Sequence, residues 1–294
     1  MVLVDVQAHT SLVRATCRHY RATAPLLLNR LLLEEAECRI MRPENRVVAD
    51  LAPTDPRTVH VRDVLRAESG QAVRAGVLDM GRSDAATVRW VSSGKEPAMR
   101  LELGPSDALL RAAPESERPR VDLLLAMPRP LQFGRMLPMM SSLGIGTLWV
   151  TKAAKTEKAY FSSHLLRAGK EAELRAALVE GLAQAGDTAV PRVRVQRNLR
   201  RLVEEELGGY ARKLVCHPAR DGAAFATIGS ALGGLDGQGR VLLAVGPEGG
   251  WEEPRELKLL QERGFQQVTL GRRTLRTDVA VVSLLAVAHD TLDG

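Results

Sequence analysis

Metal-binding and disulfide patterns are missing from this 294-residue chain, which has only three cysteines and six histidines. Cys17, Cys38 and Cys216 are widely spaced, and the histidines are equally scattered. This spacing suits a reducing compartment and predicts no metal site. Charges and glycines also interrupt every apolar run before it approaches the length of a membrane span. We therefore expect no membrane partner.

A strong excess of one charge is missing too. The formal net charge of +6 hints at an anionic partner. Acidic and basic residues nevertheless balance over residues 25–112, and residues 113–294 are only mildly basic. Net charge alone therefore does not predict RNA binding, and any basic surface has to be local.

The first 24 residues differ in composition from the rest of the chain. They contain serine, threonine and arginine but almost no acidic residue. This is the composition of an organelle transit peptide, and the alternative is a disordered or incorrectly assigned start. A transit peptide would direct the protein to a chloroplast or mitochondrion, and otherwise we expect it in the cytoplasm.

Short strands dominate the pattern that follows. Strands separated by Gly, Ser and Asp turns predict a small β-barrel domain over residues 25–112. One short helix, over residues 58–70, interrupts them. Residues 113–120 are rich in proline and charge and predict a linker. The expected strands cover residues 26–33, 47–50, 73–78, 86–91 and 98–103.

Strands alternate with helices over residues 121–294, which predicts a parallel α/β domain. Ligands of such sheets collect at the carboxyl ends of the strands. The expected strands are 121–126, 147–150, 193–195, 213–216, 241–244 and 267–270. The expected helices are 131–143, 170–184, 199–207, 253–263 and 278–289.

One strand end is rich in glycine and reads VGPEGGWEEPREL, over residues 245–257. Its glycines let the backbone approach a ligand closely. The loop lacks the Lys-Ser/Thr ending of a phosphate loop and the spacing of a dinucleotide fingerprint. Glu248 would also repel a phosphate. The stretch is either a simple turn or a loop for a neutral or cationic ligand.

A second strand end is rich in arginine and reads LGRRTLRTDVA, over residues 270–280. Three arginines precede an apolar helix there, and they form either a solvated patch or part of a cleft. Thr277 or Asp278 can cap that helix. A third strand end carries Cys216-His217-Pro218. A glycine loop beside a basic loop is typical of a cleft for two substrates.

The pair GPEGGW and LGRRTLRTDVA, at this separation near the carboxyl end, resembles the SPOUT-class RNA methyltransferases that methylate N3 of a uridine in small-subunit ribosomal RNA. The resemblance covers about residues 25–294. It implies a PUA-like RNA-binding β-barrel over 25–112, and over 121–294 a SPOUT domain with a parallel sheet and a deep trefoil knot. It also implies a homodimer that uses S-adenosyl-L-methionine. Weaker support comes from LNRLLLE, HVRDVLR, LLLAMPRP and EGLAQAGDTAVP.

The resemblance also implies the roles of individual residues. Uridine N3 is a poor nucleophile until its proton leaves. Arg276 would stabilise the charge on the uracil oxygens, Thr277 would orient the base, and Asp278 or Glu248 would accept the proton. Asp278 is equally well explained as a helix cap. The cofactor would contact Cys216, His217, Pro218, Gly246, Pro247, Glu248, Gly249, Gly250, Leu270, Gly271 and Leu275.

RNA phosphates would contact Arg30, His60, Arg62, Arg66 and Arg273, although a structural role fits His60 better. Some positions depart from the family pattern, since Asp278-Val279 replaces Glu-Thr and Ser142 replaces Glu. These changes affect the RNA-facing half and therefore the identity of the target. The substrate is either free ribosomal RNA or the assembled small subunit.

Two other functions compete with this one. The first is an inactive RNA-binding or ribosome-assembly factor on the same scaffold, which would need neither the glycine loop nor Arg276. The second is a nucleotide-dependent oxidoreductase. The missing dinucleotide fingerprint and the late position of the glycine loop argue against it.

Overall fold

A computed structural model describes residues 28–92, 94–218, 226–235, 237 and 239–293. The described residues form two compact units. The parallel-sheet unit holds residues 118–178 and 191–293, and the mixed-sheet unit holds residues 28–117 and 179–190. The predicted transit peptide at residues 1–24 lies outside the described part. None of the helices in the described part is long and apolar enough to cross a membrane.

The parallel-sheet unit is built on six strands that all run in the same direction, in the order β12-β10-β11-β7-β8-β9. This confirms the predicted α/β fold with a parallel sheet. All six carboxyl ends therefore meet at one edge. The strands are β7 (Val121–Ala126), β8 (Ile145–Lys152), β9 (Arg192–Asn198), β10 (Arg212–Cys216), β11 (Val241–Val245) and β12 (Phe265–Val268).

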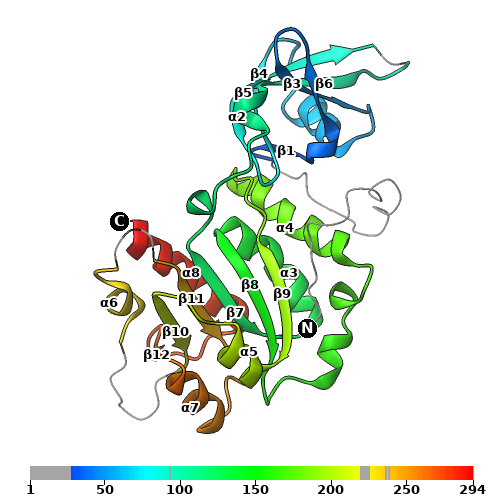
Figure 1. The fold of residues 1–294 in the computed structure, drawn as a ribbon. Helices are drawn as coiled ribbons and strands as arrows, with labels where there is room; N and C mark the ends of the chain where they lie inside the picture. Colours follow the sequence, from blue (N-terminus) through cyan, green and yellow to red (C-terminus); the bar gives the residue numbers. More distant parts are fainter. Residues whose placement is uncertain (1–27, 93, 219–225, 236, 238, 294) are drawn as a thin grey trace. The chain divides into compact units, whose positions relative to one another are not determined.

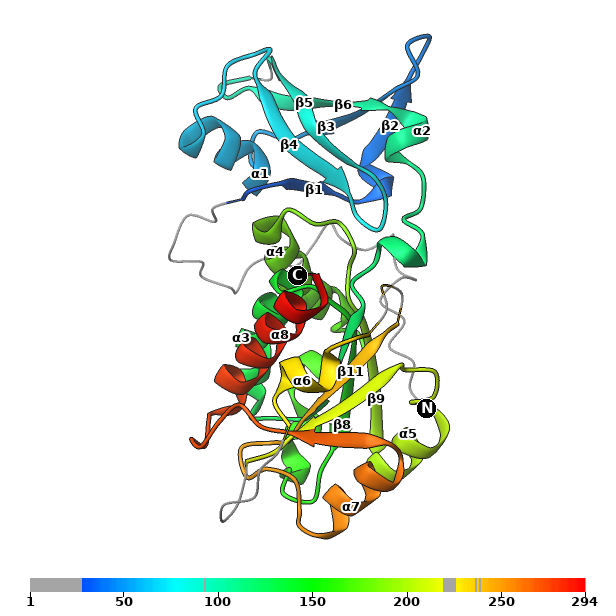
Figure 2. The same ribbon diagram turned by 90° about the vertical axis from the view of Figure 1, so that its left-hand side faces the viewer.

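Helices cover both faces of this sheet (Figures 1 and 2). Strand β7 is buried on both faces, since Leu123 and Leu125 pack toward one helix layer and Leu124 toward the other. Near-continuous apolar strands are typical of such covered parallel sheets. The first layer contains α3 (Pro130–Ser142), the start of α4 (Glu171–Ala185), α6 (Ile228–Leu232) and α8 (Thr277–Asp293). The second contains α5 (Leu199–Glu205) and α7 (Arg255–Glu262).

The mixed-sheet unit contains a second six-stranded sheet, in the order β1-β4-β5-β6-β3-β2. Strand β1 pairs in parallel with β4, and the other pairs are antiparallel. Helices α1 (Pro56–Val59), which continues as one π-helical turn over His60–Val64, and α2 (Ser106–Leu109) accompany it. The strands are β1 (Leu31–Leu33), β2 (Cys38–Met41), β3 (Arg46–Leu51), β4 (Ala72–Val77), β5 (Arg82–Val91) and β6 (Ala98–Pro105).

Residues 179–190 join the mixed-sheet unit from far along the chain. Leu182 and Val190 pack against Leu32 and Leu78 in a small apolar cluster. The hydroxyl of Thr188 donates to the carbonyl of Met80 at 2.8 Å. The predicted span of 25–112 does not include this segment, because nothing local in its sequence says which unit it joins.

Several element boundaries differ from the prediction. Strand β12 begins at Phe265 and ends two residues earlier than predicted. The stretch 58–70, which the sequence predicts as a short helix running into a turn, is helical only as far as Val64. Arg66, two residues later, has a positive φ of 49°, which no α-helix contains. Strand β2 and helix α6 were not predicted, because each is a short segment without a clear apolar period.

Candidate active site

A cavity of about 320 Å³ lies at the carboxyl ends of β10, β11 and β12. These three strands are neighbours in the sheet, so the loops that follow them meet at one place. We call it the glycine-lined cavity. Its lining residues are Lys155, Cys216, His217, Pro218, Val245, Gly246, Pro247, Glu248, Gly249, Gly250, Thr269, Leu270, Gly271, Arg273, Thr274, Leu275, Thr277 and Ala280.

The wall after β11 is a tightly folded backbone. A Cβ atom at Gly246 would lie 2.9 Å from the backbone nitrogen of Trp251 and 3.1 Å from Cα of Gly250. The N–H of Gly250 donates to the carbonyl of Pro247 at 2.7 Å, and Gly250 has a φ of +67°. Trp251 is fully buried beneath the loop. Gly246 is therefore required by the close approach of the loop backbone to itself.

Two side chains hold this loop in place. The Nζ atom of Lys155 donates to the carbonyl of Gly249 at 2.8 Å and to that of Trp251 at 3.4 Å. His217 is buried, and its Nε2 atom hydrogen-bonds to the carboxylate of Glu253. The loops after β8, β10 and β11 are thus cross-linked, which fixes the shape of the cavity before any ligand arrives.

Charge is sparse in the glycine-lined cavity. Glu248 is exposed, and its Oε1 atom accepts the backbone N–H of Arg129 at 2.9 Å. Burial raises the pKa of the Cys216 thiol to about 11, so this group is neutral at physiological pH. The ammonium of Lys155 faces backbone carbonyls. The cavity therefore suits a ligand that is held largely by backbone groups.

The start of α8 lies at the rim of the cavity. Thr277 is buried and lines the cavity, while Arg276 and Asp278 do not. The Nη2 atom of Arg276 lies 3.0 Å from Oδ2 of Asp278, and the Arg276 side chain is 77% exposed. Asp278 also accepts the N–H of Val279 at 2.9 Å. The exposed Arg276 is thus paired with Asp278 beside the opening.

The structure brings together all eleven residues that were predicted to contact the cofactor, and Arg273 and Thr277 lie with them. Lys155 was not predicted, because it follows a distant strand and belongs to no motif. Thr269 was also missed, although its hydroxyl accepts the N–H of Gly271 at 3.1 Å and so shapes the loop after β12. The described residues contain no group of three or more His, Cys, Asp or Glu placed to hold a metal ion.

The predicted RNA contacts of the mixed-sheet unit have different surroundings. Arg30 is buried and donates to the carbonyls of Ala75 and Gly186, both at 2.8 Å, and to Asp84. His60 is also buried, and desolvation lowers its pKa, which keeps the ring neutral at pH 7.

The two other predicted contacts of this unit are more accessible. Arg62 pairs with Asp63 at 2.7 Å and with Glu96 at 2.8 Å. Arg66 is exposed. Of the four predicted phosphate contacts in the unit, Arg66 is therefore the most accessible to a ligand.

A parallel α/β unit with a preformed cavity at its strand ends has the architecture of a cofactor-dependent enzyme. Residues 115–289 match the family model described as an RNA methyltransferase domain. The ribosomal RNA small subunit methyltransferase E of Treponema pallidum is 30% identical over 243 residues, which cover 81% of this chain and 84% of the relative. The protein of the same name from Synechocystis is 24% identical and covers 87% of this chain and 78% of the relative. The chain belongs to this family of small-subunit ribosomal RNA methyltransferases.

Solved structures share the fold at low sequence identity. A ribosomal RNA small subunit methyltransferase E from Neisseria gonorrhoeae, bound to S-adenosyl methionine, has a TM-score of 0.60 and 20% identity. The match covers 90% of this chain and 97% of that one. A methyltransferase from Legionella pneumophila, in complex with the same cofactor, has a TM-score of 0.57 and 19% identity and covers 89% and 97% of the two chains.

Proposed function

We propose that this protein transfers a methyl group from S-adenosyl-L-methionine to N3 of a specific uridine in small-subunit ribosomal RNA. One observation carries the proposal. The three loops singled out in the sequence meet in one preformed cavity, in a chain of the small-subunit ribosomal RNA methyltransferase family.

The residues of the glycine-lined cavity fit this cofactor. The position of Gly246 leaves no room for a Cβ atom, so backbone N–H and C=O groups line the wall. S-adenosylmethionine supplies a methyl group on a positively charged sulfonium. A neutral thiol at Cys216 does not compete for that methyl group, whereas a thiolate would. Glu248 also lines this cavity, and its negative charge favours a cation such as the sulfonium.

The chain's own residues would prepare the uridine. In the transfer, the N3–H bond breaks and its proton passes to a carboxylate, while N3 forms the new bond to carbon as the bond from carbon to sulfur breaks. Asp278 or Glu248 accepts the proton, and Thr277 orients the base. Arg276 would leave Asp278 and stabilise the negative charge on the uracil oxygens. Its high exposure leaves it free to do so.

The finer features of the fold belong to the same proposal. The parallel-sheet unit would be a SPOUT domain with a deep trefoil knot, and the mixed-sheet unit a PUA-like β-barrel that binds RNA. Arg66 and Arg62 would make phosphate contacts in that unit, together with Arg273 in the other. Arg30 and His60 are buried, so they would support that surface from within. The substrate would be free ribosomal RNA or the assembled small subunit.

We also propose that the protein is a homodimer. Helices α3 and α8 pack against each other and leave large apolar side chains exposed. Leu131 and Met139 belong to α3, and Val279 and Val287 belong to α8. An apolar surface of this kind is typical of a subunit interface. Light scattering of the purified protein should give twice the chain mass, and Met139→Lys should reduce it to one.

Mass spectrometry of small-subunit RNA tests the reaction directly. RNA from cells that lack this protein should have lost one 3-methyluridine and should regain it when the gene is restored. An unchanged modification pattern would refute the proposal. Calorimetry with S-adenosylmethionine separates the enzyme from an inactive assembly factor, because only the enzyme has to bind it.

Arg276→Ala tests the proposed chemistry. We expect methyl transfer to fall by about 100-fold or more, because charge on the uracil is no longer stabilised, while cofactor affinity stays nearly unchanged. Arg272→Ala is the matched control, since Arg272 belongs to the same basic loop but has no proposed role. Near-normal turnover of the Arg276 variant would remove this residue from the mechanism.

A further inference from the structure

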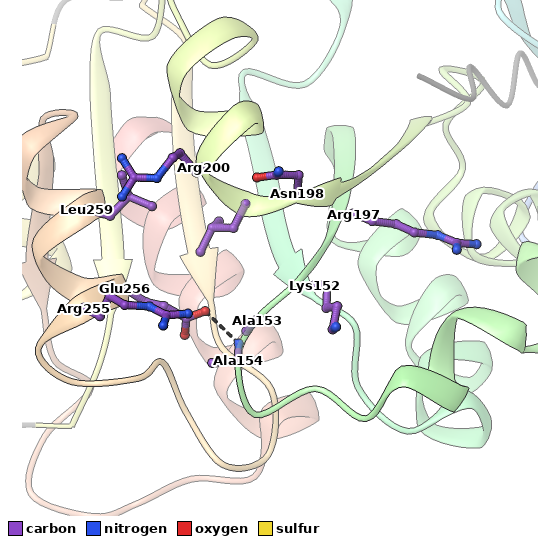
Figure 3. Close-up of a pocket in the computed structure, with 10 residues that line it drawn as sticks. Lys152, Ala153, Ala154, Arg197, Asn198, Arg200, Arg255, Glu256 and Leu259 are labelled. Carbon is purple, nitrogen blue, oxygen red and sulfur yellow. Dashed lines mark hydrogen bonds between the residues drawn. The ribbon is translucent and has the colours of Figure 1, made fainter.

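A second and larger cavity lies on the same edge of the parallel sheet. It has a volume of about 630 Å³ and lies at the carboxyl ends of β8 and β9, between α5 and α7. Four of its lining side chains are basic, and we call it the basic cavity. Its lining residues are Lys152, Ala153, Ala154, Arg197, Asn198, Leu199, Arg200, Arg255, Glu256 and Leu259. Figure 3 shows Arg200 and Arg255 on one side and Lys152 and Arg197 on the other.

Among the described residues that line this cavity, Glu256 is the one carboxylate, and it forms no ion pair with the four basic side chains. It is buried, and its Oε1 atom accepts the N–H of Ala154 at 2.7 Å, drawn as a dashed line in Figure 3. Its Oε2 atom accepts the N–H of Glu252, also at 2.7 Å. Two backbone donors thus stabilise its charge. The cavity keeps an excess of positive charge.

The basic side chains are free or weakly held. Among the residues that the structure describes, neither Lys152 nor Arg197 has a carboxylate partner, and Arg197 lies over the ring of Phe161 at 5.3 Å. Arg200 pairs with Glu204 at 3.3 Å and Arg255 pairs with Glu252 at 3.2 Å, both with exposed side chains. Exposed pairs of this kind contribute little and exchange readily for a phosphate.

The floor of the basic cavity is apolar. Ala153, Leu199 and Leu259 are all buried. Basic side chains around an apolar floor suit a nucleic-acid strand, whose phosphates need cations and whose bases need apolar or stacking contacts. The volume lies in the ordinary range for ligand sites and so admits a nucleotide.

The basic cavity shares its framework with the glycine-lined cavity. Ala154 lines the first and its neighbour Lys155 lines the second. The loop after β11 also reaches both, since its glycines line one cavity and Arg255, where α7 begins, lines the other. A strand in the basic cavity would therefore lie next to a target base at the methyl donor.

We propose that the basic cavity binds the sugar-phosphate backbone of single-stranded RNA next to the methylated uridine. This inference rests on the proposed function and adds a second RNA contact, on the parallel-sheet unit itself. Lys152, Arg200 and Arg255 hold the phosphates. The site therefore contributes to RNA affinity and leaves cofactor binding and the chemical step alone.

Two triple variants of the full-length protein test the site. The first, Lys152→Gln/Arg200→Gln/Arg255→Gln, removes three charges from the cavity. The control, Arg201→Gln/Lys258→Gln/Arg263→Gln, removes three charges from α5, α7 and the residue after α7, outside the lining. Binding of a labelled single-stranded RNA of about 12 nucleotides is measured over a range of salt concentrations.

The cavity variant should bind this RNA at least tenfold more weakly than the control variant. The slope of its logarithmic affinity against logarithmic salt concentration should fall by about 2, because three phosphate contacts of a single strand are lost. With ribosomal RNA as substrate, KM should rise while kcat at saturating RNA stays within about twofold. The double variant Arg200→Lys/Arg255→Lys keeps the charges, so its salt slope should equal that of the wild-type protein.

Equal slopes for the cavity and control variants would overturn the inference. Binding of uridine monophosphate in the cavity, without any change in RNA affinity, would assign it to a small anion and overturn the inference as well. Failure of the proposed function has a different signature. The wild-type protein would then not methylate the RNA at all, while the salt slopes would still decide whether the cavity binds it.

Discussion

The two cavities of the parallel-sheet unit lie on one edge of one sheet, yet different groups line them. The glycine-lined cavity follows β10, β11 and β12 and is walled by folded backbone, with few charges. The basic cavity follows β8 and β9 and is walled by long cationic side chains. Backbone walls fix a shape for one small ligand, whereas flexible cations bind a chain of phosphates with little demand on geometry. In the proposed function, the glycine-lined cavity recognises the methyl donor and the basic cavity holds the RNA.

Gly246→Ala should have the largest effect, because it acts on the rigid wall. The new Cβ atom would lie 2.9 Å from the nitrogen of Trp251, so the backbone has to move. We expect a loss of about 2–3 kcal/mol in the free energy of unfolding and at least about a 100-fold loss of cofactor affinity, measured by thermal unfolding and calorimetry. RNA affinity should fall much less.

Gly249→Ala is the matched control for that variant. Its Cβ atom would meet only the flexible side chain of Lys155, at 3.0 Å, which can move aside. Similar losses of cofactor affinity in both variants would contradict the rigid-wall interpretation, because only the first has a backbone clash.

Raising the pH above 9 should lower the free energy of unfolding through Cys216, which lines the glycine-lined cavity. Its pKa is about 11 in the folded protein, above the ordinary value of 9.0. Below pH 9 both states hold the proton, so its contribution to stability is fully present there. Between pH 9 and 11 only the unfolded state ionises, and about 2 kcal/mol of stability is lost. Cys216→Ala should show a shallower decline in urea unfolding over this range, and identical declines would show that the thiol is not responsible.

Glu256→Gln tests whether both cavities depend on the hydrogen bonds of the Glu256 carboxylate. The carboxylate accepts the N–H groups of Ala154 and Glu252, and an amide can accept only one of them well. We expect a loss of about 1–2 kcal/mol of stability and a modest decline in both cofactor and RNA affinity. Glu262→Gln, on the same helix, should change stability by less than about 0.5 kcal/mol. An effect on one ligand alone would show that the cavities do not share this support.

The sequence predicted the two cavities very unequally. Continuous motifs revealed the glycine-lined cavity, because GPEGG and LGRRTL each place several lining residues together. The basic cavity was not predicted, since Lys152, Arg197 and Arg255 come from separate segments and each resembles an ordinary surface charge. Only the order of strands in the sheet brings their positions together.

Burial was harder to predict than secondary structure. Most strands and helices of the parallel-sheet unit were predicted to within a few residues, because their apolar periods are clear. The sequence predicts Arg30 as a phosphate contact, but its guanidinium donates to backbone carbonyls inside the mixed-sheet unit. The sequence records the charge of such a residue, whereas its partners come from segments more than 40 residues away.

Lys155→Met should have the smallest effect, and it tests whether any cation matters in the glycine-lined cavity. The ammonium donates to the carbonyls of Gly249 and Trp251, so its removal loosens the loop without unfolding it. Loss of one well-formed hydrogen bond is worth about 1 kcal/mol, which corresponds to about a fivefold loss of cofactor affinity by calorimetry. The salt dependence of RNA binding should not change, because these donors face backbone and not phosphate. Lys158→Met, an exposed lysine in the following segment, should change neither quantity. A reduced salt slope for the Lys155 variant would mean that RNA reaches this cavity too, and the division between the two cavities would fail.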